Sequence, residues 1–193
     1  MQFNPATHRY QINGRPVPSV TTVLADILPA WKAGEWYLQR GTAVHACAAM
    51  VARGHEFEHD PAIDGQVRAC RKWFADFAPK VEAVEAQVYS LQYQFAGTLD
   101  LLAYVDGRLT VVDWKASISP AVHYQLAAYA LAYEEQHKVK VVQGVAVALL
   151  DTGAYKLGLT VSGTNFGRAK REWLSILNVY SMRRKHKITE EGI

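Results

Sequence analysis

The sequence predicts one α/β domain spanning residues 1–193, with a central mixed, mostly antiparallel sheet flanked by helices. Helical periodicity dominates the first third of the chain and returns in the second half. Between these stretches lie segments rich in β-branched and aromatic residues, which are typical of strands. A length of 193 residues without an internal repeat or a linker favours one compact core.

The first part of the chain is expected to form a hairpin and then three helices. Asn13-Gly14 favours a type I′ turn within a hairpin over Arg9–Val17. Ser19 precedes a short apolar segment as a helix cap should. The expected helices are Val20–Leu28, the alanine-rich Gly41–Arg53, and the amphipathic Asp64–Phe77, which Ala78-Pro79 ends.

The second part of the chain alternates strands with two further helices. Asp106-Gly107 and Thr152-Gly153 mark the turns. Ser119-Pro120 resembles a helix start, with serine as the cap and proline in the first helical position. The expected strands are Val84–Phe95, Gly97–Val105, Leu109–Lys115, Lys140–Leu150 and Ala154–Val161, and the expected helices are 120–135 and Asn165–Met182.

The composition excludes several classes of protein. No apolar run approaches the roughly 18 residues of a membrane helix, and the amino end resembles neither a secretory signal nor a transit peptide. Cys47 and Cys70 are the only cysteines, too few for an all-cysteine zinc site or an iron–sulfur cluster. Nothing indicates a disulfide framework, so we expect a cytoplasmic protein with no membrane partner.

The net charge of +3 is small, but it is unevenly distributed. Between Arg168 and Lys187 there are seven basic residues and one acid, so this segment carries +6 and the rest of the chain −3. A basic helix and tail over residues 165–193 can track phosphates. A solvated helix face explains the same pattern, and both interpretations stay open here.

The most informative segment is the expected hairpin over residues 97–115. If Asp106-Gly107 closes it directly, Val105 pairs with Arg108 and Asp100 lies opposite Asp113, with Cβ atoms about 5 Å apart. Lys115 lies two residues beyond Asp113 and therefore points to the same face of the strand. A β-bulge would shift this register.

Two carboxylates held this close repel each other unless a cation or a proton lies between them. Oxygen ligands of this kind suit one or two Mg²⁺ or Mn²⁺ ions, and the Trp114 carbonyl can add another oxygen. An ordinary surface ion cluster is the alternative. It is disfavoured because Leu102, Leu109 and Val111 share the face, which is therefore not a solvated one.

These motifs resemble the RecB-type branch of the PD-(D/E)XK nucleases, whose fold is restriction-endonuclease-like. Gly97-Thr98-Leu99-Asp100 followed by Asp113-Trp114-Lys115 carries the resemblance, and Gln125 and Tyr129 match the branch's Gln-x-x-x-Tyr motif. Four residues apart, both side chains share one helix face. The resemblance implies that this helix lies beside the catalytic hairpin and orders DNA or the lysine.

The upstream half is similar to the same family. Arg40-Gly41-Thr42-Ala43-Val44-His45 resembles its Gly-x-x-x-His helix, which implies that His45 binds a metal ion and places Arg40 near DNA. Glu85 stands where the family often has an acid, and it either binds metal or caps a strand.

The segment from Pro18 to Leu24 adds a resemblance to the mitochondrial genome maintenance exonucleases and to related phage and bacterial proteins. Ala116 departs from the threonine that is common after the lysine, which removes a possible phosphate or backbone contact. A bacterial cell or a phage-infected host is therefore the expected setting.

The resemblance implies hydrolysis of DNA from an end, with single strands preferred. Asp100, Asp113 and Lys115 would be catalytic, and Ser19 and Thr21 are candidates for phosphate contacts or simply helix caps. Trp31, Trp36 and Tyr37 are either core residues or a stacking surface for bases. A junction or duplex endonuclease and a non-catalytic DNA-binding module are the alternatives.

Overall fold

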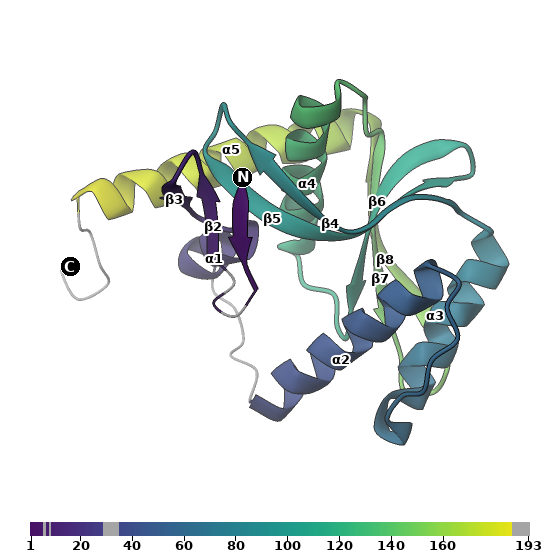
Figure 1. Ribbon diagram of the computed structural model, residues 1–193. Helices are drawn as coiled ribbons and strands as arrows, with labels where there is room; N and C mark the ends of the chain where they lie inside the picture. Colours follow the sequence, from purple (N-terminus) through teal and green to yellow (C-terminus); the bar gives the residue numbers. More distant parts are fainter. Residues whose placement is uncertain (6, 8, 29–34, 187–193) are drawn as a thin grey trace.

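The computed structural model describes residues 1–5, 7, 9–28 and 35–186. Within these residues, two sheets and five α-helices follow one another along the chain (Figure 1). The elements are β1 (Gln2–Asn4), β2 (Arg9–Ile12), β3 (Arg15–Val17), α1 (Val20–Ile27), α2 (Glu35–Ala52), the 3-10 turn η1 (Pro61–Ile63), α3 (Asp64–Phe77), β4 (Lys80–Ser90), β5 (Phe95–Val105), β6 (Arg108–Lys115), α4 (Val122–His137), β7 (Gln143–Leu149), β8 (Tyr155–Ser162) and α5 (Gly163–His186).

The larger sheet has five strands in the order β4-β5-β6-β7-β8. All neighbours are antiparallel except β6 and β7, which run parallel because α4 crosses over between them. The prediction of a mixed, mostly antiparallel sheet flanked by helices is therefore confirmed. The parallel pair at its centre carries the end of β6 deep into the domain.

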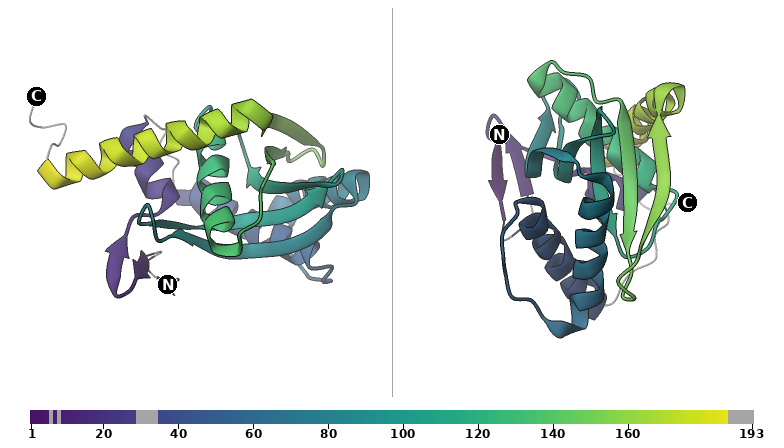
Figure 2. Two further views of the ribbon diagram at one scale, coloured as in Figure 1. Left: turned by 90° about the horizontal axis from the view of Figure 1, so that it is seen from above. Right: turned by 90° about the vertical axis from the view of Figure 1, so that its right-hand side faces the viewer.

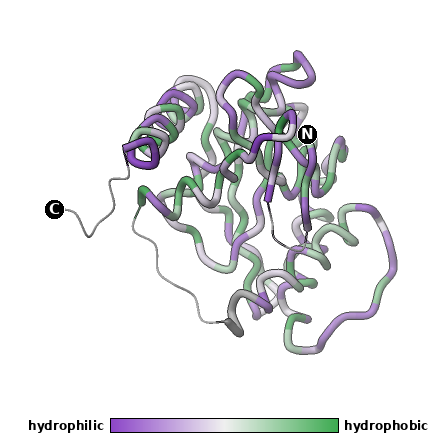
Figure 3. Tube along the Cα trace, turned by 60° about the vertical axis from the view of Figure 1, so that its left-hand side comes forward, coloured by the Kyte–Doolittle hydropathy of each residue, from purple (hydrophilic) through white to green (hydrophobic). Residues whose placement is uncertain are grey.

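Helices cover both faces of this sheet (Figure 2). One core packs α1, α4 and α5 against one face, around Phe95, Leu126 and Trp173. The other core packs α2 and α3 against the opposite face, around Trp73 and Trp114, whose rings meet edge to face at 5.1 Å. Figure 3 shows that hydrophobic and hydrophilic residues alternate along the helices and strands.

The predicted register of the β5–β6 hairpin is confirmed from Val105–Arg108 to Leu101–Val112. Asp106 and Gly107 have φ angles of 49° and 73°, as both central residues of a type I′ turn require. The recorded pairing stops one position before Asp100 and Asp113. At that position the Asp100 side chain connects the two strands, because its Oδ2 accepts a hydrogen bond from the Trp114 backbone N–H at 2.8 Å.

The strand predicted over Val84–Phe95 is wrong in both bounds, since β4 spans Lys80–Ser90 and residues 91–94 form a turn. The Glu135 carboxylate of α4 accepts the backbone N–H groups of Leu91 and Gln92 and the Ser90 hydroxyl. A residue some 45 positions away thus satisfies the turn, and local sequence patterns carry no sign of it.

The predicted start of the 120–135 helix is also wrong, because α4 begins at Val122 and its cap, Ala121, makes no side-chain bond. Ser119 and Pro120 precede the helix. Ile118 packs against the core and fits where Gly158 of β8 has no side chain. Residues 116–117 form a bend and residues 120–121 a turn, in which the Val122 N–H donates to the Ser119 carbonyl at 3.2 Å, so the helix begins only after this turn.

Other helix boundaries differ as well. The helices predicted from Gly41 and Asn165 begin earlier, at Glu35 and Gly163, and the second also ends later, at His186. The predicted α3 is confirmed at both ends, as are the hairpin around Asn13-Gly14 and the Ser19 cap of α1. Strand β1, which sequence patterns did not indicate, adds a third strand to that hairpin.

The small amino-terminal sheet is fastened to β5, and this contact forms one wall of the cleft that follows. The Tyr10 hydroxyl lies 2.9 Å from Thr98 Oγ1, and the Ala96 N–H donates to the Pro18 carbonyl at 3.1 Å. The aromatic group predicted at Trp31, Trp36 and Tyr37 lies outside the residues whose side chains are described. In the described part of the chain, no helix is long and apolar enough to cross a bilayer.

Candidate active site

A cleft of about 710 Å³ lies between the amino-terminal sheet and α1 on one side and α2 on the other. Its floor is formed by β4, β5 and α4. Eight of the candidate residues from the sequence line it: Ser19, Thr21, His45, Glu85, Asp100, Lys115, Gln125 and Tyr129. These residues come from six different elements, so the tertiary fold alone brings them together.

The inner half of the site is a buried network around Asp113, of which only 1% is exposed. Lys115 Nζ lies 2.6 Å from Asp113 Oδ2, and the Gln125 amide donates to Asp113 Oδ1 at 2.9 Å. The same amide donates to the Tyr129 hydroxyl at 3.1 Å. The Gln-x-x-x-Tyr pair of α4 therefore holds the aspartate rather than the lysine.

Burial raises the pKa of Asp113 to about 6; the nearby Lys115 lowers it and the Asp100 charge raises it. Burial lowers the pKa of Lys115, but the charges of Asp113 and Asp100 outweigh this effect, so the net pKa is above its usual value. Lys115 is thus an ammonium ion at neutral pH, fixed at the edge of the cleft.

The outer half of the site is a cluster of side chains of the types that can ligate a metal ion. His45, Glu85 and Asp100 each offer a ligand atom, and these atoms lie within 4.8 Å of one another. His45 Nδ1 lies 3.2 Å from Asp100 Oδ1. Asp100 uses its other oxygen for the Trp114 N–H, which fixes the carboxylate plane. Among the residues that the structure describes, Asp113 lies outside this group.

Glu85 reaches the cluster through an unusual backbone conformation. Its φ angle is 51° although it lies within β4, and a non-glycine residue in this region is strained by about 1 kcal/mol or more. Burial and the Asp100 charge raise the pKa of Glu85 to about 7, although His45 and Arg53 lower it. For His45, burial lowers the pKa and Asp100 more than restores it, giving a net rise.

This donor set fits a divalent metal ion. The carboxylates of Glu85 and Asp100 converge so closely that the Asp100 charge disfavours the ionised form of Glu85, which a bound dication would reverse. Two carboxylates and one imidazole are a ligand set that Mg²⁺ and Mn²⁺ accept with water completing the shell. A role for the Trp114 carbonyl remains a prediction.

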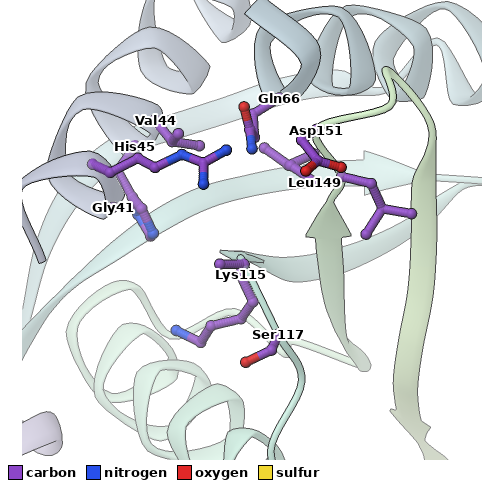
Figure 4. Close-up of a pocket in the computed structure, with 11 residues that line it drawn as sticks. Gly41, Val44, His45, Gln66, Lys115, Ser117, Leu149 and Asp151 are labelled. Carbon is purple, nitrogen blue, oxygen red and sulfur yellow. The ribbon is translucent and has the colours of Figure 1, made fainter. Parts of the chain in front are cut away.

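A second cavity of about 430 Å³ adjoins the cleft and shares Gly41, His45 and Lys115 with it (Figure 4). Arg40 lines this cavity rather than the cleft itself. The cavity ends at Gln66 of α3 and at Asp151, which follows β7. The start of α3 can approach Asp151 this closely because Gly65 has no side chain. A Cβ at Gly65 would collide with the Asp151 backbone.

Some residues of the cleft were not singled out from the sequence. Tyr10, Thr98 and Arg53 line it, and Arg53 also donates to the Val84 carbonyl at 3.3 Å. Thr98 belongs to the Gly-Thr-Leu-Asp motif and lies two residues before Asp100, so the motif could have identified Thr98 as a candidate site residue. Ser19 and Thr21 line the cleft, while Ser19 also caps α1 through the Thr22 N–H.

A mixed sheet with two acids and a lysine at the end of its central hairpin defines a nuclease-like α/β fold. Residues 58–171, more than half of the chain, match the family model of the PD-(D/E)XK nuclease superfamily. The chain belongs to this superfamily. The family assignment made from the sequence motifs is therefore confirmed, and no curated protein sequence matches the chain.

One of three similar solved structures supports the fold. A putative exonuclease from Eubacterium rectale superposes with a TM-score of 0.52 at 14% identity, over 83% of this chain and 71% of that one. For an alkaline exonuclease from Laribacter hongkongensis bound to dAMP, the TM-score is 0.46 at 12% identity, over 89% of this chain and 93% of that one. For a phage-related exonuclease from Haemophilus somnus, the TM-score is 0.44 at 11% identity, over 93% of this chain and 98% of that one. Only the first score is high enough to support the shared fold.

Proposed function

We propose that this protein is a metal-dependent exonuclease that hydrolyses phosphodiester bonds at the ends of single-stranded DNA. The observation that carries the proposal is the convergence of the His45–Glu85–Asp100 cluster and the Asp113–Lys115 pair in one cleft. Membership of a nuclease superfamily supports the same chemistry.

His45, Glu85 and Asp100 would hold one Mg²⁺ or Mn²⁺ ion, and Asp113 stands beside them for a second. When bound, such an ion activates water and stabilises charge on the phosphate and on the leaving oxygen. Lys115 Nζ faces the cleft as a fixed cation, where it stabilises negative charge that develops on the phosphate. Gln125 and Tyr129 keep Asp113 in place, and the hydrolysed product would carry a 5′-phosphate.

The proposal of a single-stranded substrate rests on the shape of the cleft and on the motif resemblance. The cleft has walls on two sides, which confine one strand more readily than a duplex. Ser19 and Thr21 line the cleft at the start of α1, where they would contact phosphates, and Arg40 lines the adjoining cavity. The Eubacterium rectale protein of the same fold carries the description of a putative exonuclease, which agrees with cleavage from an end.

Digestion of end-labelled DNA tests the proposal. Linear and circular single strands and a linear duplex are incubated with Mg²⁺ or Mn²⁺, and the products are resolved on a gel. We expect linear single strands to be shortened, while circles and EDTA-treated samples persist. The Asp113→Asn variant should lose at least about a hundredfold in rate. Asp106→Asn, a matched change in the exposed hairpin turn, should cleave normally.

The outcomes separate the alternatives. Cleavage of circular strands or of duplex interiors would identify an endonuclease. An Asp113→Asn protein that cleaves as fast as the unchanged protein would overturn the assigned site. DNA binding without cleavage in either metal would indicate a binding module.

A further inference from the structure

The last turn of α5 is a cationic surface outside the cleft. We call Arg183, Arg184, Lys185 and His186 the basic end of α5; Figure 3 shows this turn in hydrophilic colours. From Trp173 to His186 the helix contains no acid. The side chains of Arg184, Lys185 and His186 are exposed. This concentration of positive charge costs electrostatic free energy unless an anion offsets it.

The fold uses only part of this charge. Arg183 binds α1, with its guanidinium 3.0 Å from the Asp26 carbonyl and 3.5 Å from its carboxylate. Arg184 lies over the Tyr180 ring, 5.6 Å from the ring centre. In the described part of the chain, no ion pair engages Arg184 or Lys185. One cation suffices to offset the partial negative charge of a helix carboxyl end, so these two exceed what the helix requires.

The basic end of α5 is also close to the cleft. Helix α1 begins beside Ser19 and Thr21, which line the cleft, and ends near Asp26, which holds Arg183. The seven steps along the helix from Ser19 to Asp26 span about 10 Å at about 1.5 Å per residue. Stacked nucleotides cover about 3.4 Å each along one strand, so about three nucleotides bridge this distance. Figure 1 shows α5 passing α1 and projecting beyond it.

We propose that the basic end of α5 is a second contact surface for the DNA strand held in the cleft, and that it binds phosphates of the nucleotides outside the site. The inference rests on the proposed function for the identity of the strand. Exposed Met182 and Val179, which are 49% and 41% accessible, lie on the same part of the helix and offer apolar surface to unpaired bases. Such contacts are independent of base sequence.

Salt-dependent binding tests the inference. Arg184→Gln/Lys185→Gln is compared with the unchanged protein and with Arg168→Gln/Arg171→Gln, which removes the same charge from the other end of α5. Binding of fluorescent single strands of about 5 and about 30 nucleotides is measured by anisotropy in EDTA, which stops hydrolysis. Loss of two phosphate contacts should reduce the slope of log affinity against log salt by about 1.4 for the long strand only.

The expected result is severalfold weaker binding of the long strand by Arg184→Gln/Lys185→Gln, with the short strand and the control variant unaffected. Equal salt slopes for all three proteins on the long strand would overturn the inference. An equal loss of affinity for the short and the long strand would overturn it as well. Cleavage of the short strand is assayed in parallel. If the unchanged protein fails to cleave but shows the slope difference, the proposed function fails and this surface stands.

Discussion

The inner and outer halves of the site differ in what offsets their negative charge. In the inner half, the protein itself neutralises Asp113 with the Lys115 ammonium and the Gln125 amide. In the outer half, Glu85 and Asp100 converge with only an imidazole between them, and the pKa of Glu85 rises to about 7. The protein itself therefore offsets much of the charge of the inner half, whereas the charge of the outer half favours a bound cation.

The largest effect should come from breaking the inner half. Lys115→Met leaves Asp113 charged and buried without its cation, which should lower the free energy of unfolding by about 3 kcal/mol. Urea denaturation measures this loss. The double variant Lys115→Met/Asp113→Asn should recover most of it, because the unpaired charge is gone. An unchanged denaturation midpoint for Lys115→Met would show that the pair contributes little to stability.

Breaking the outer half should affect metal binding and leave folding intact. Glu85→Gln and His45→Ala should each weaken Mn²⁺ binding by at least about tenfold, measured by calorimetric titration. The midpoint of Glu85→Gln in metal-free urea should not fall, since this change relieves repulsion with Asp100. Glu82→Gln, on the same strand but exposed, is the matched control. Normal Mn²⁺ affinity in both variants would refute the assigned ligands.

Gly97 connects the two halves, because it lies in the cleft and against Tyr129. An added Cβ there would stand 2.6 Å from Tyr129 Cε1, so the ring that supports Gln125 would have to move. Gly97→Ala should lower the free energy of unfolding by about 1–2 kcal/mol and reduce the cleavage rate. Gly41→Ala, which meets open space within a helix, should not reduce stability. Equal stability of both variants would contradict this contact.

The smallest effect should be a dependence of metal stabilisation on pH. A raised carboxylate pKa means that the folded protein holds the proton more tightly than the unfolded chain does. Protonation of Glu85 and Asp113 therefore stabilises the metal-free fold at low pH, and this contribution is lost as the pH rises through about 6 to 7. Metal ions compete with these protons, so Mn²⁺ should raise the melting temperature more at pH 8 than at pH 5.5. A larger rise in melting temperature at pH 5.5 than at pH 8 would contradict the raised pKa values of Glu85 and Asp113.

Much of the β5–β6 hairpin could be predicted from the sequence because local rules govern it. Asp106-Gly107 fixes the turn, the turn fixes the register, and the two-residue period of a strand places Asp113 and Lys115 on one face. The Ser19 cap follows from similarly local chemistry. The end of β4 was missed because Glu135, from a distant element, accepts the hydrogen bonds of the turn that follows it. The start of α4 was missed because Ser119 accepts the Val122 N–H through its carbonyl in a turn and does not cap the helix with its side chain.

The sequence by itself determined the hairpin, the family and the identity of the candidate residues, since motifs and turn chemistry are properties of short segments. Only the tertiary structure decided how those residues divide into two halves. Glu85 joins His45 and Asp100 because β4 adopts a left-handed conformation at that residue, and Gln125 turns to Asp113 because α4 crosses the sheet there. Such contacts depend on packing between elements far apart in the chain, which no local pattern encodes.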